Sequence, residues 1–162
     1  MNQKGFATFE AILAVTIISV LAFIAVPKID RVIDKIALDY EMKRLCSEIE
    51  FASSLNRSAG FDSEIFDRTI TNNQNEITLE INTVNNYWRL KRGTQPLRNS
   101  HHLFAGIKIS CSSDGVKNIK FDSYGVYQGG SGRITLTSRH GEQAEIVFDT
   151  VGRWRGNKNI EY

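Results

Sequence analysis

A single carboxylate, Glu10, lies at the start of a long uncharged run near the N-terminus. No further Asp, Glu, Lys or Arg occurs until Lys28, and the stretch from Ala11 to Val26 is almost entirely apolar. A charged side chain inside a bilayer costs roughly 2.5–3.5 kcal/mol on insertion scales, so such a residue normally has a partner and a function. Glu10 is therefore the first candidate functional residue.

Residues that could support catalysis or bind a metal occur, but not in patterns that assemble a site. The adjacent His101 and His102 would point to opposite faces of a strand, and together with Cys111 they form no recognised ligand spacing. The Gly-rich stretch from Gly129 to Gly132 lacks the Lys-Ser/Thr pair of a phosphate-binding loop. The sequence therefore predicts no catalytic residue, no metal and no cofactor, and we do not expect an enzyme.

One basic region lies in the middle of the chain. Between Glu80 and Asp114 there is no acid. The region contains five basic residues and two neighbouring aromatic residues: Arg89, Lys91, Arg92, Arg98 and Lys108, with Tyr87 and Trp88. Such a segment can attract an anionic partner, although scattered solvated side chains give the same composition.

A second basic region lies near the C-terminus, where "GRWRGNK" places Arg153, Arg155 and Lys158 around Trp154. Basic side chains neutralise phosphates and an exposed aromatic ring can stack on a base, so these four residues are candidate contacts to DNA. The alternative is that Trp154 covers the core and that the two arginines pair with nearby acids: Glu142, Glu145 or Asp149.

The two cysteines, Cys46 and Cys111, have no metal-site spacing. One disulfide between them would suit an exported domain. Two buried free thiols fit the sequence equally well, and both interpretations stay open.

The apolar run approaches the ~20 residues that a helix needs to span a bilayer. Lys4 on its short side predicts a cytoplasmic N-terminus, with the rest of the chain outside. A cleaved secretory signal or a plain signal anchor would also explain an apolar N-terminal segment. Neither explains Glu10.

Helical periodicity continues beyond Pro27, which should kink or loosen the helix. We expect one helix from Phe6 to Ala59, about 80 Å long, with Gly60 as its C-cap and a polar connection from Phe61 to Asn75. Two sets of apolar residues recur at spacings of three and four: Ile29, Ile33, Ile36 and Tyr40, and Leu38, Met42, Leu45, Ile49 and Ala52. These stripes need a sheet or neighbouring helices to cover them.

The second half of the chain changes to a period of two, which is typical of strands. Alternation is clearest around residues 77–82, 88–91, 107–111, 133–137 and 144–149, with Gly-containing turns between several of these segments. We therefore predict an α+β fold in which a long N-terminal helix packs on an antiparallel sheet of hairpins.

The N-terminal "KGFATFE" resembles the signal of type IV prepilins. A basic residue (Lys4) precedes Gly5, an aromatic residue (Phe6) follows it, and Glu10 is the fifth residue after the Gly. The resemblance implies that a prepilin peptidase cleaves between Gly5 and Phe6 and methylates the new N-terminus at Phe6. It also implies that Glu10 is an assembly residue, which meets the Phe6 amine of a neighbouring subunit in the filament core. The expected organisation is a leader at 1–5, a transmembrane and filament-core helix at 6–27, its amphipathic continuation at 28–60 and a β domain at 61–162.

The segment from Ile119 to Arg155 is similar to the C-terminal region of the GspH/FimT group of minor pilins and pseudopilins. The shared elements are an aromatic residue followed by a Gly turn (Phe121 and Gly125), two strands, and the closing pair Gly152-Arg153. The resemblance implies a subunit of a type IV pilus, of a DNA-uptake pseudopilus or of a type II secretion pseudopilus. The implied location is the inner membrane and then the filament, with other pilin subunits and prepilin peptidase as partners.

Some members of the FimT branch bind DNA during natural transformation through a C-terminal Gly-Arg motif. For this chain the resemblance implies double-stranded DNA as an alternative partner, with Arg153 and Arg155 as phosphate contacts and Lys158 as a weaker one. Trp154 lies between the two arginines.

Overall fold

The computed structural model describes residues 3–66, 77–112, 116–122, 124–129, 131–149 and 151–159. Within these ranges, the side chains of 3–8, 27, 59–66, 116 and 157–159 are not described. Within the described residues, one helix, α1 (Gln3–Phe66), is followed by nine strands. These are β1 (Ile77–Asn82), β2 (Tyr87–Arg92), β3 (Gln95–Pro96), β4 (His101–His102), β5 (Lys108–Cys111), β6 (Val116–Lys120), β7 (Gly132–Thr137), β8 (Gln143–Phe148) and β9 (Trp154–Asn159).

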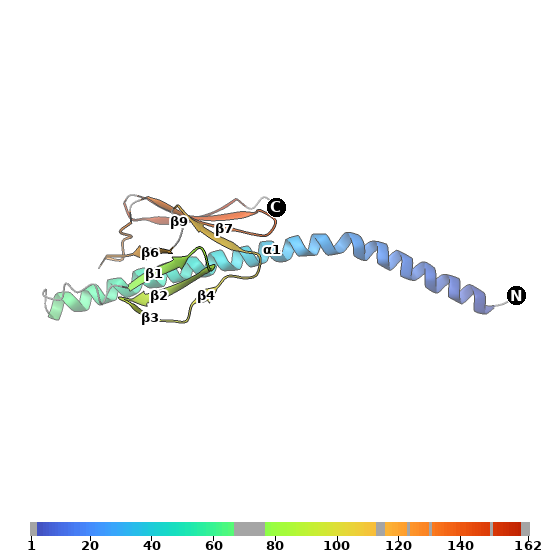
Figure 1. Ribbon diagram of the computed structural model, residues 1–162, viewed down its shortest axis with the longest axis horizontal. Coiled ribbons are helices and arrows are strands. Elements are labelled where there is room, and N and C mark those ends of the chain that lie inside the picture. The colour runs from blue at the N-terminus through green and yellow to red at the C-terminus, as the bar shows by residue number, and fades with distance from the viewer. Residues whose placement is uncertain are drawn as a thin grey trace.

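Helix α1 has 64 residues, or about 96 Å of helix, and its N-terminal half projects beyond the strands (Figure 1). The helix is continuous through residue 27, and its ribbon bends gently instead of breaking. Gly60 does not end the helix, contrary to the prediction, because α1 continues to Phe66. A Gly inside a helix costs only about 1 kcal/mol relative to Ala, and no proline follows it to stop the helix. The predicted connection from Phe61 to Asn75 is thus partly helical, and its residues after Phe66 lie outside the described residues.

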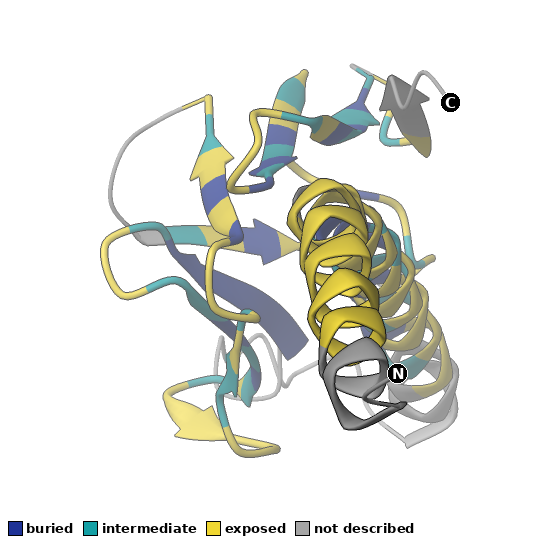
Figure 2. Cartoon of the chain, turned by 90° about the vertical axis from the view of Figure 1, so that its right-hand side faces the viewer, coloured by how far each residue is buried: buried dark blue, intermediate teal, exposed yellow. Residues whose placement is uncertain are grey.

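The strands form two antiparallel sheets, where the sequence predicted one. Sheet A has the order β3-β2-β1-β6, with β4 also pairing with β2, and sheet B has the order β5-β7-β8-β9. The single-sheet prediction was wrong because β5 pairs with β7, while β6 returns to the far side of β1. Viewed along α1, the sheets lie around one side of the helix and leave its other side open (Figure 2).

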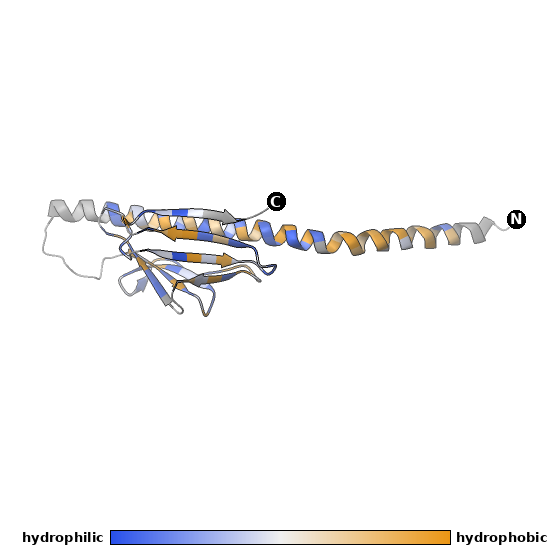
Figure 3. Cartoon of the chain, turned by 90° about the horizontal axis from the view of Figure 1, so that it is seen from above, coloured by the Kyte–Doolittle hydropathy of each residue, from blue (hydrophilic) through white to orange (hydrophobic). Residues whose placement is uncertain are grey.

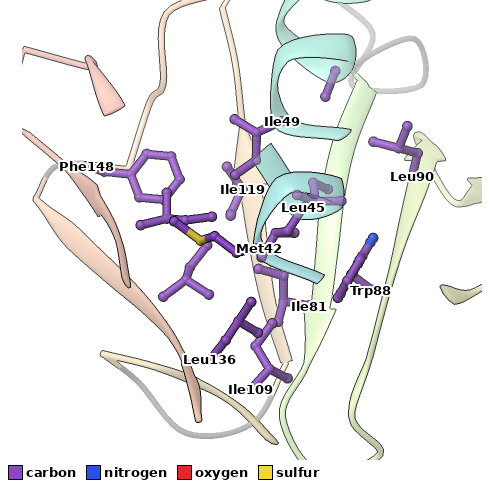
Figure 4. Close-up of a cluster of buried hydrophobic side chains, with 14 of the residues drawn as sticks. Met42, Leu45, Ile49, Ile81, Trp88, Leu90, Ile109, Ile119, Leu136 and Phe148 are labelled. Carbon is purple, nitrogen blue, oxygen red and sulfur yellow. The ribbon is translucent and has the colours of Figure 1, made fainter. Parts of the chain in front are cut away.

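The core forms where α1 meets the inner faces of both sheets. Met42, Leu45 and Ile49 of the helix lie between residues of sheet B such as Phe148 and residues of sheet A such as Ile81 (Figure 4). The predicted stripe of five apolar helix residues is confirmed as buried, with exposed fractions of 0–3%: Leu38, Met42, Leu45, Ile49 and Ala52. The strands predicted from alternation are confirmed as β1, β2, β5, β7 and β8. Burial alternates along β2, β5, β7 and β8, whereas β1 is buried at every residue because it lies in the middle of sheet A under the helix.

Polar contacts fix the helix against particular strands. The Asn56 side chain accepts a hydrogen bond from the Ile77 backbone N–H (3.1 Å) and donates one to the Ile77 carbonyl (2.8 Å), so it pairs with β1 as another strand would. The Ser53 hydroxyl donates to the Gly125 carbonyl (2.7 Å). Gly125 has a φ of +75°, and a Cβ there would lie 2.7 Å from the Ser53 Oγ, so this close turn requires glycine.

Candidate functional site

The largest uncovered feature is the apolar N-terminal half of α1. Figure 3 shows apolar residues along the part of the helix that projects beyond the sheets. Eleven large apolar side chains between Phe9 and Val26 are 51–84% exposed. The helix is long and apolar enough to cross a membrane. The rest of the chain buries no part of its most apolar 18-residue stretch. Isolated apolar residues are common on protein surfaces, but a continuous surface of this kind needs a membrane or a partner to cover it.

The polar groups in this apolar half differ in how they are satisfied. The Thr16 and Ser19 hydroxyls donate to the carbonyls of Leu13 and Val15, each at 2.7 Å, as suits an environment without water. Glu10 is exposed, and no hydrogen bond or ion pair joins it to any described side chain. In an apolar environment this carboxylate would need a partner from outside the described part of the chain. Gly5 and Phe6 lie in the first turns of α1, and their side chains are outside the described residues.

The uncovered apolar surface continues past Pro27 onto the half of α1 that carries the sheets. Ile29, Ile33, Ile36 and Tyr40 are 49–65% exposed, although they follow the same spacing as the buried stripe. Phe104, between β4 and β5, is 58% exposed and packs edge-on against Tyr40 with ring centroids 6.3 Å apart. We call these five residues the apolar ridge.

The C-terminal basic residues are brought together only in part. Arg155 is paired in register with Val147, whereas Lys158 is paired with the buried Ala144. Positions an odd number apart alternate between faces, so position 158 does not share the face of position 155, and the Lys158 side chain lies outside the described residues. Arg155 and Arg153 line one open groove of about 420 Å³.

The two arginines of this groove are in different electrostatic states. Arg153 is paired with Asp149, because its Nε lies 3.1 Å from Oδ2 and its backbone N–H donates to Oδ1 (2.8 Å). Arg155 is exposed, and no ion pair joins it to any described acid. Trp154 is partly buried and packs against the core. The alternative of ion pairing and core packing is thus correct for Arg153 and Trp154, and Arg155 remains available to a ligand.

The other basic region is largely neutralised. Glu80, buried on β1, forms ion pairs with Arg89 (3.0 Å) and Lys91. Burial by itself would raise the pKa of Glu80, but hydrogen bonds from Lys91 and Tyr87 and the charges of Lys91 and Arg89 outweigh it and lower that pKa. Trp88 is only 1% exposed, so it cannot stack on a base.

A third basic residue of this region, Arg98, lies 3.3 Å from Glu48 of α1 and over the ring of Phe51. Arg92 and Lys108 are exposed. Most of this segment therefore stabilises the fold and offers no coherent basic surface.

Both cysteines are free, which answers the question that the sequence left open. Cys46 lies near Gly156 of β9, whereas Cys111 ends β5 at the opposite edge of sheet B. Three strand spacings, about 14 Å, separate those edges, and a disulfide needs Cα atoms within about 7 Å. Burial, followed by the nearby Glu50, raises the pKa of the Cys46 thiol to about 11.

The sequence analysis missed two acid–histidine contacts that hold the helix to strand β4 and to the turn between β7 and β8. The fully buried carboxylate of Glu41 lies 2.8 Å from His101 Nε2 and accepts a hydrogen bond from the Phe104 N–H (3.1 Å). Asp34 Oδ2 lies 2.7 Å from His140 Nδ1. The sequence feature that could have indicated these contacts is the position of Asp34 and Glu41, which helical spacing places beside the buried stripe. The described residues contain no cluster that could hold a metal, and His101 is engaged by Glu41 instead.

Comparisons of this chain with protein-family models, with curated proteins and with solved structures gave no match.

Proposed function

We propose that this chain is a subunit of a type IV pilus-like filament, a minor pilin or pseudopilin of the GspH/FimT type. The observation that carries the proposal is the uncovered apolar half of α1 with a carboxylate, Glu10, that has no partner among the described residues. A membrane can cover such a helix before assembly, and the helices of neighbouring subunits can cover it afterwards. The prepilin-like "KGFATFE" and the C-terminal resemblance to this group support the same proposal.

Glu10 has a specific role in this proposal. Cleavage between Gly5 and Phe6 creates a positively charged amine, and the amine of one subunit pairs with Glu10 of its neighbour. A buried carboxylate without a partner is strongly unfavourable, so the pairing selects the correct register between helices. The apolar ridge extends the same contact surface onto the half of α1 that carries the sheets.

Processing can be tested by producing the full chain in a membrane with an active or an inactivated prepilin peptidase. Mass spectrometry should find the N-terminus at Phe6, methylated, only with the active enzyme. Gly5→Leu should abolish cleavage. An intact N-terminus with the active peptidase would contradict the proposal.

Assembly can be tested with Glu10→Gln and with Glu50→Gln, which changes an exposed carboxylate on the same helix outside the apolar run. Glu10→Gln should be processed normally but should not crosslink with other filament subunits, whereas Glu50→Gln should crosslink as the wild-type chain does. Equal crosslinking of both variants would remove the role assigned to Glu10.

A second candidate function, DNA binding during uptake, is favoured by one observation: Arg155 is exposed, without an ion pair to a described acid, in the groove beside Trp154. A mobility-shift titration of the full chain in detergent micelles with duplex DNA tests it. Binding should be independent of sequence and should fall steeply with salt. Arg155→Gln should weaken binding more than Arg153→Gln, since Asp149 already holds Arg153. The absence of binding at low salt would exclude this function.

A further inference from the structure

Strand β9 forms an open edge of sheet B. It pairs with β8 on one side, and no described strand pairs with its other side. An edge strand presents a row of N–H and C=O groups that can pair with an added strand.

The register identifies which backbone groups of β9 face outward. The Asp149 N–H donates to the Arg153 carbonyl (2.9 Å), so these two residues are a hydrogen-bonded pair. The next three pairs along the ladder are Phe148 with Trp154, Val147 with Arg155, and Ile146 with Gly156. Hydrogen-bonded and non-hydrogen-bonded pairs alternate along an antiparallel ladder. The N–H and C=O groups of Trp154 and Gly156 therefore point away from β8, toward the open side.

A groove between β9 and α1 reaches Gly156, one of the residues whose backbone groups point to the open side. Its volume is about 420 Å³, and it is lined by Met42, Lys43, Cys46, Ser47, Glu50 and Gly156. Met42 and Cys46 make its floor apolar and join it to the core, while the other helix residues are polar. A Cβ at position 156 would lie 2.6 Å from the Met42 Cε, so glycine brings the edge backbone close to the helix.

The outer face of β9 adds a charge next to this edge. Arg155 points to the face opposite Gly156 and has no ion pair with a described acid. A residue directly opposite it on an added strand would be a cross-strand neighbour, where opposite charges attract. The inward neighbours of that residue would contact the apolar floor.

We propose that the groove binds an extended peptide segment of a partner protein, which adds as a strand to the edge of β9. Its backbone pairs with the outward groups of Trp154 and Gly156. Small apolar side chains at alternate positions pack on Met42 and Cys46, and acidic side chains at the intervening positions pair with Arg155. The occupant is thus a peptide of alternating apolar and acidic residues. This mode of recognition takes its affinity from main-chain hydrogen bonds and its specificity from alternate side chains.

The test uses the full chain in detergent micelles and a fluorescein-labelled peptide of alternating Glu and Val, with fluorescence anisotropy as the readout. The peptide should bind, and it should slow the alkylation of Cys46. A Lys-Val peptide of equal length should not bind, because it places cations beside Arg155. A peptide in which proline replaces each valine should not bind either, because it lacks the N–H donors that would pair with Trp154 and Gly156.

Two variants locate the site. Ser47→Arg places a long charged side chain in the groove and should weaken binding at least about tenfold. Ser58→Arg, an equivalent change at an exposed serine of α1 that does not line the groove, should leave binding unchanged. Arg155→Glu should reverse the charge preference, so that the Lys-Val peptide binds better than the Glu-Val peptide.

Three outcomes would overturn the proposal. The first is unchanged binding to Ser47→Arg, which would place the peptide elsewhere. The second is equal binding of the proline-containing peptide, which would exclude strand addition. The third is self-association of the full chain that Ser47→Arg abolishes while the peptide fails to bind, which would make a second copy the occupant. None of these outcomes bears on processing between Gly5 and Phe6, so the filament proposal is tested independently of this one.

Discussion

Helix α1 carries two apolar stripes with the same spacing, of which one is buried and the other is exposed. Leu45 is fully buried, whereas Ile36, nine residues earlier, is 65% exposed. Nine residues are two and a half turns of helix, so the two side chains lie on opposite faces. The sheets cover only one of these faces (Figure 2). The covered stripe holds the domain together, and the uncovered one is free to contact a membrane or another subunit.

This difference shows that burial in the folded chain does not follow from apolar periodicity alone. A helix that is apolar on both faces is usually enclosed within a larger structure. Here the N-terminal half of α1 extends well beyond the strands, and the ridge from Ile29 to Tyr40 continues that apolar surface onto the domain. An assembly of several chains could enclose the uncovered face. The isolated chain leaves it open.

The strongest test of the comparison changes one residue type on each face. Ile49→Ala should cost about 2–5 kcal/mol of unfolding free energy, because it opens a cavity in the core. Ile36→Ala should change it by less than about 0.5 kcal/mol, because the side chain is exposed and alanine is the better helix former. Denaturant unfolding of the full chain in detergent micelles, followed by the fluorescence of Trp88 and Trp154, measures both.

Similar losses for the two variants would mean that the ridge is covered within a single chain, and the comparison would fail. A loss for Ile36→Ala that depends on protein concentration would instead identify self-association through the ridge. Crosslinking of the same variants in the proposed filament sharpens the test further, since Ile36→Ala should impair packing there without affecting folding.

The next effect comes from the polar contacts beside the covered stripe. Glu41→Ala should cost about 1–3 kcal/mol, because it leaves His101 and the Phe104 N–H without their buried partner. Glu50→Ala, which removes an exposed carboxylate from the same helix, should have almost no effect. The unfolding assay used for the isoleucines measures both. If Glu41→Ala were neutral, the acid–histidine contact would not contribute to holding the loop on the helix.

How far the sequence predicted this fold depends on how local each signal was. Strict alternation identified β7 and β8, because each buries one face and exposes the other. Strand β9 was missed, since Trp154–Asn159 contains a Gly and two Asn and becomes a strand only through its register with β8. The two stripes of α1 were found, but nothing in their spacing indicated which of them the sheets would cover.

The basic residues show the same limit at the level of the candidate site. The window after Glu80 contains no acid, yet Arg89 is paired, because the β1–β2 register places Glu80 directly opposite it. Glu48, which pairs with Arg98, comes from the helix. Counting charges along the sequence does not identify ion-pair partners that the tertiary structure brings from distant positions. Arg155, in contrast, was a candidate contact and remains exposed and unpaired among the described residues.

A smaller effect is expected in acid, at Glu80. Because the pKa of this carboxyl is lower in the folded chain than its ordinary value of 4.5, the folded state holds its proton less tightly than the unfolded state does. Glu80 therefore stabilises the fold above pH 4.5, and this stabilisation is lost as the pH falls through the lower, folded-state pKa. Unfolding free energies measured from pH 7 downward should decrease less steeply below pH 4.5 for Glu80→Gln than for the wild-type chain. Identical slopes would mean that the ion pairs with Arg89 and Lys91 contribute nothing to stability.

The smallest effect is expected at the exposed pair of Arg153 and Asp149. Asp149 has a lowered pKa, chiefly because the Arg153 backbone N–H donates to its carboxylate, and the guanidinium adds less. The Val151 N–H donates to the same carboxylate (3.0 Å), so two backbone N–H groups hold the turn independently of the arginine side chain. Arg153→Gln should therefore leave the denaturation midpoint unchanged, whereas Asp149→Ala should lower it. Equal and clear losses for both variants would show that the ion pair itself holds the turn, and Arg153→Gln could then no longer separate DNA contact from folding.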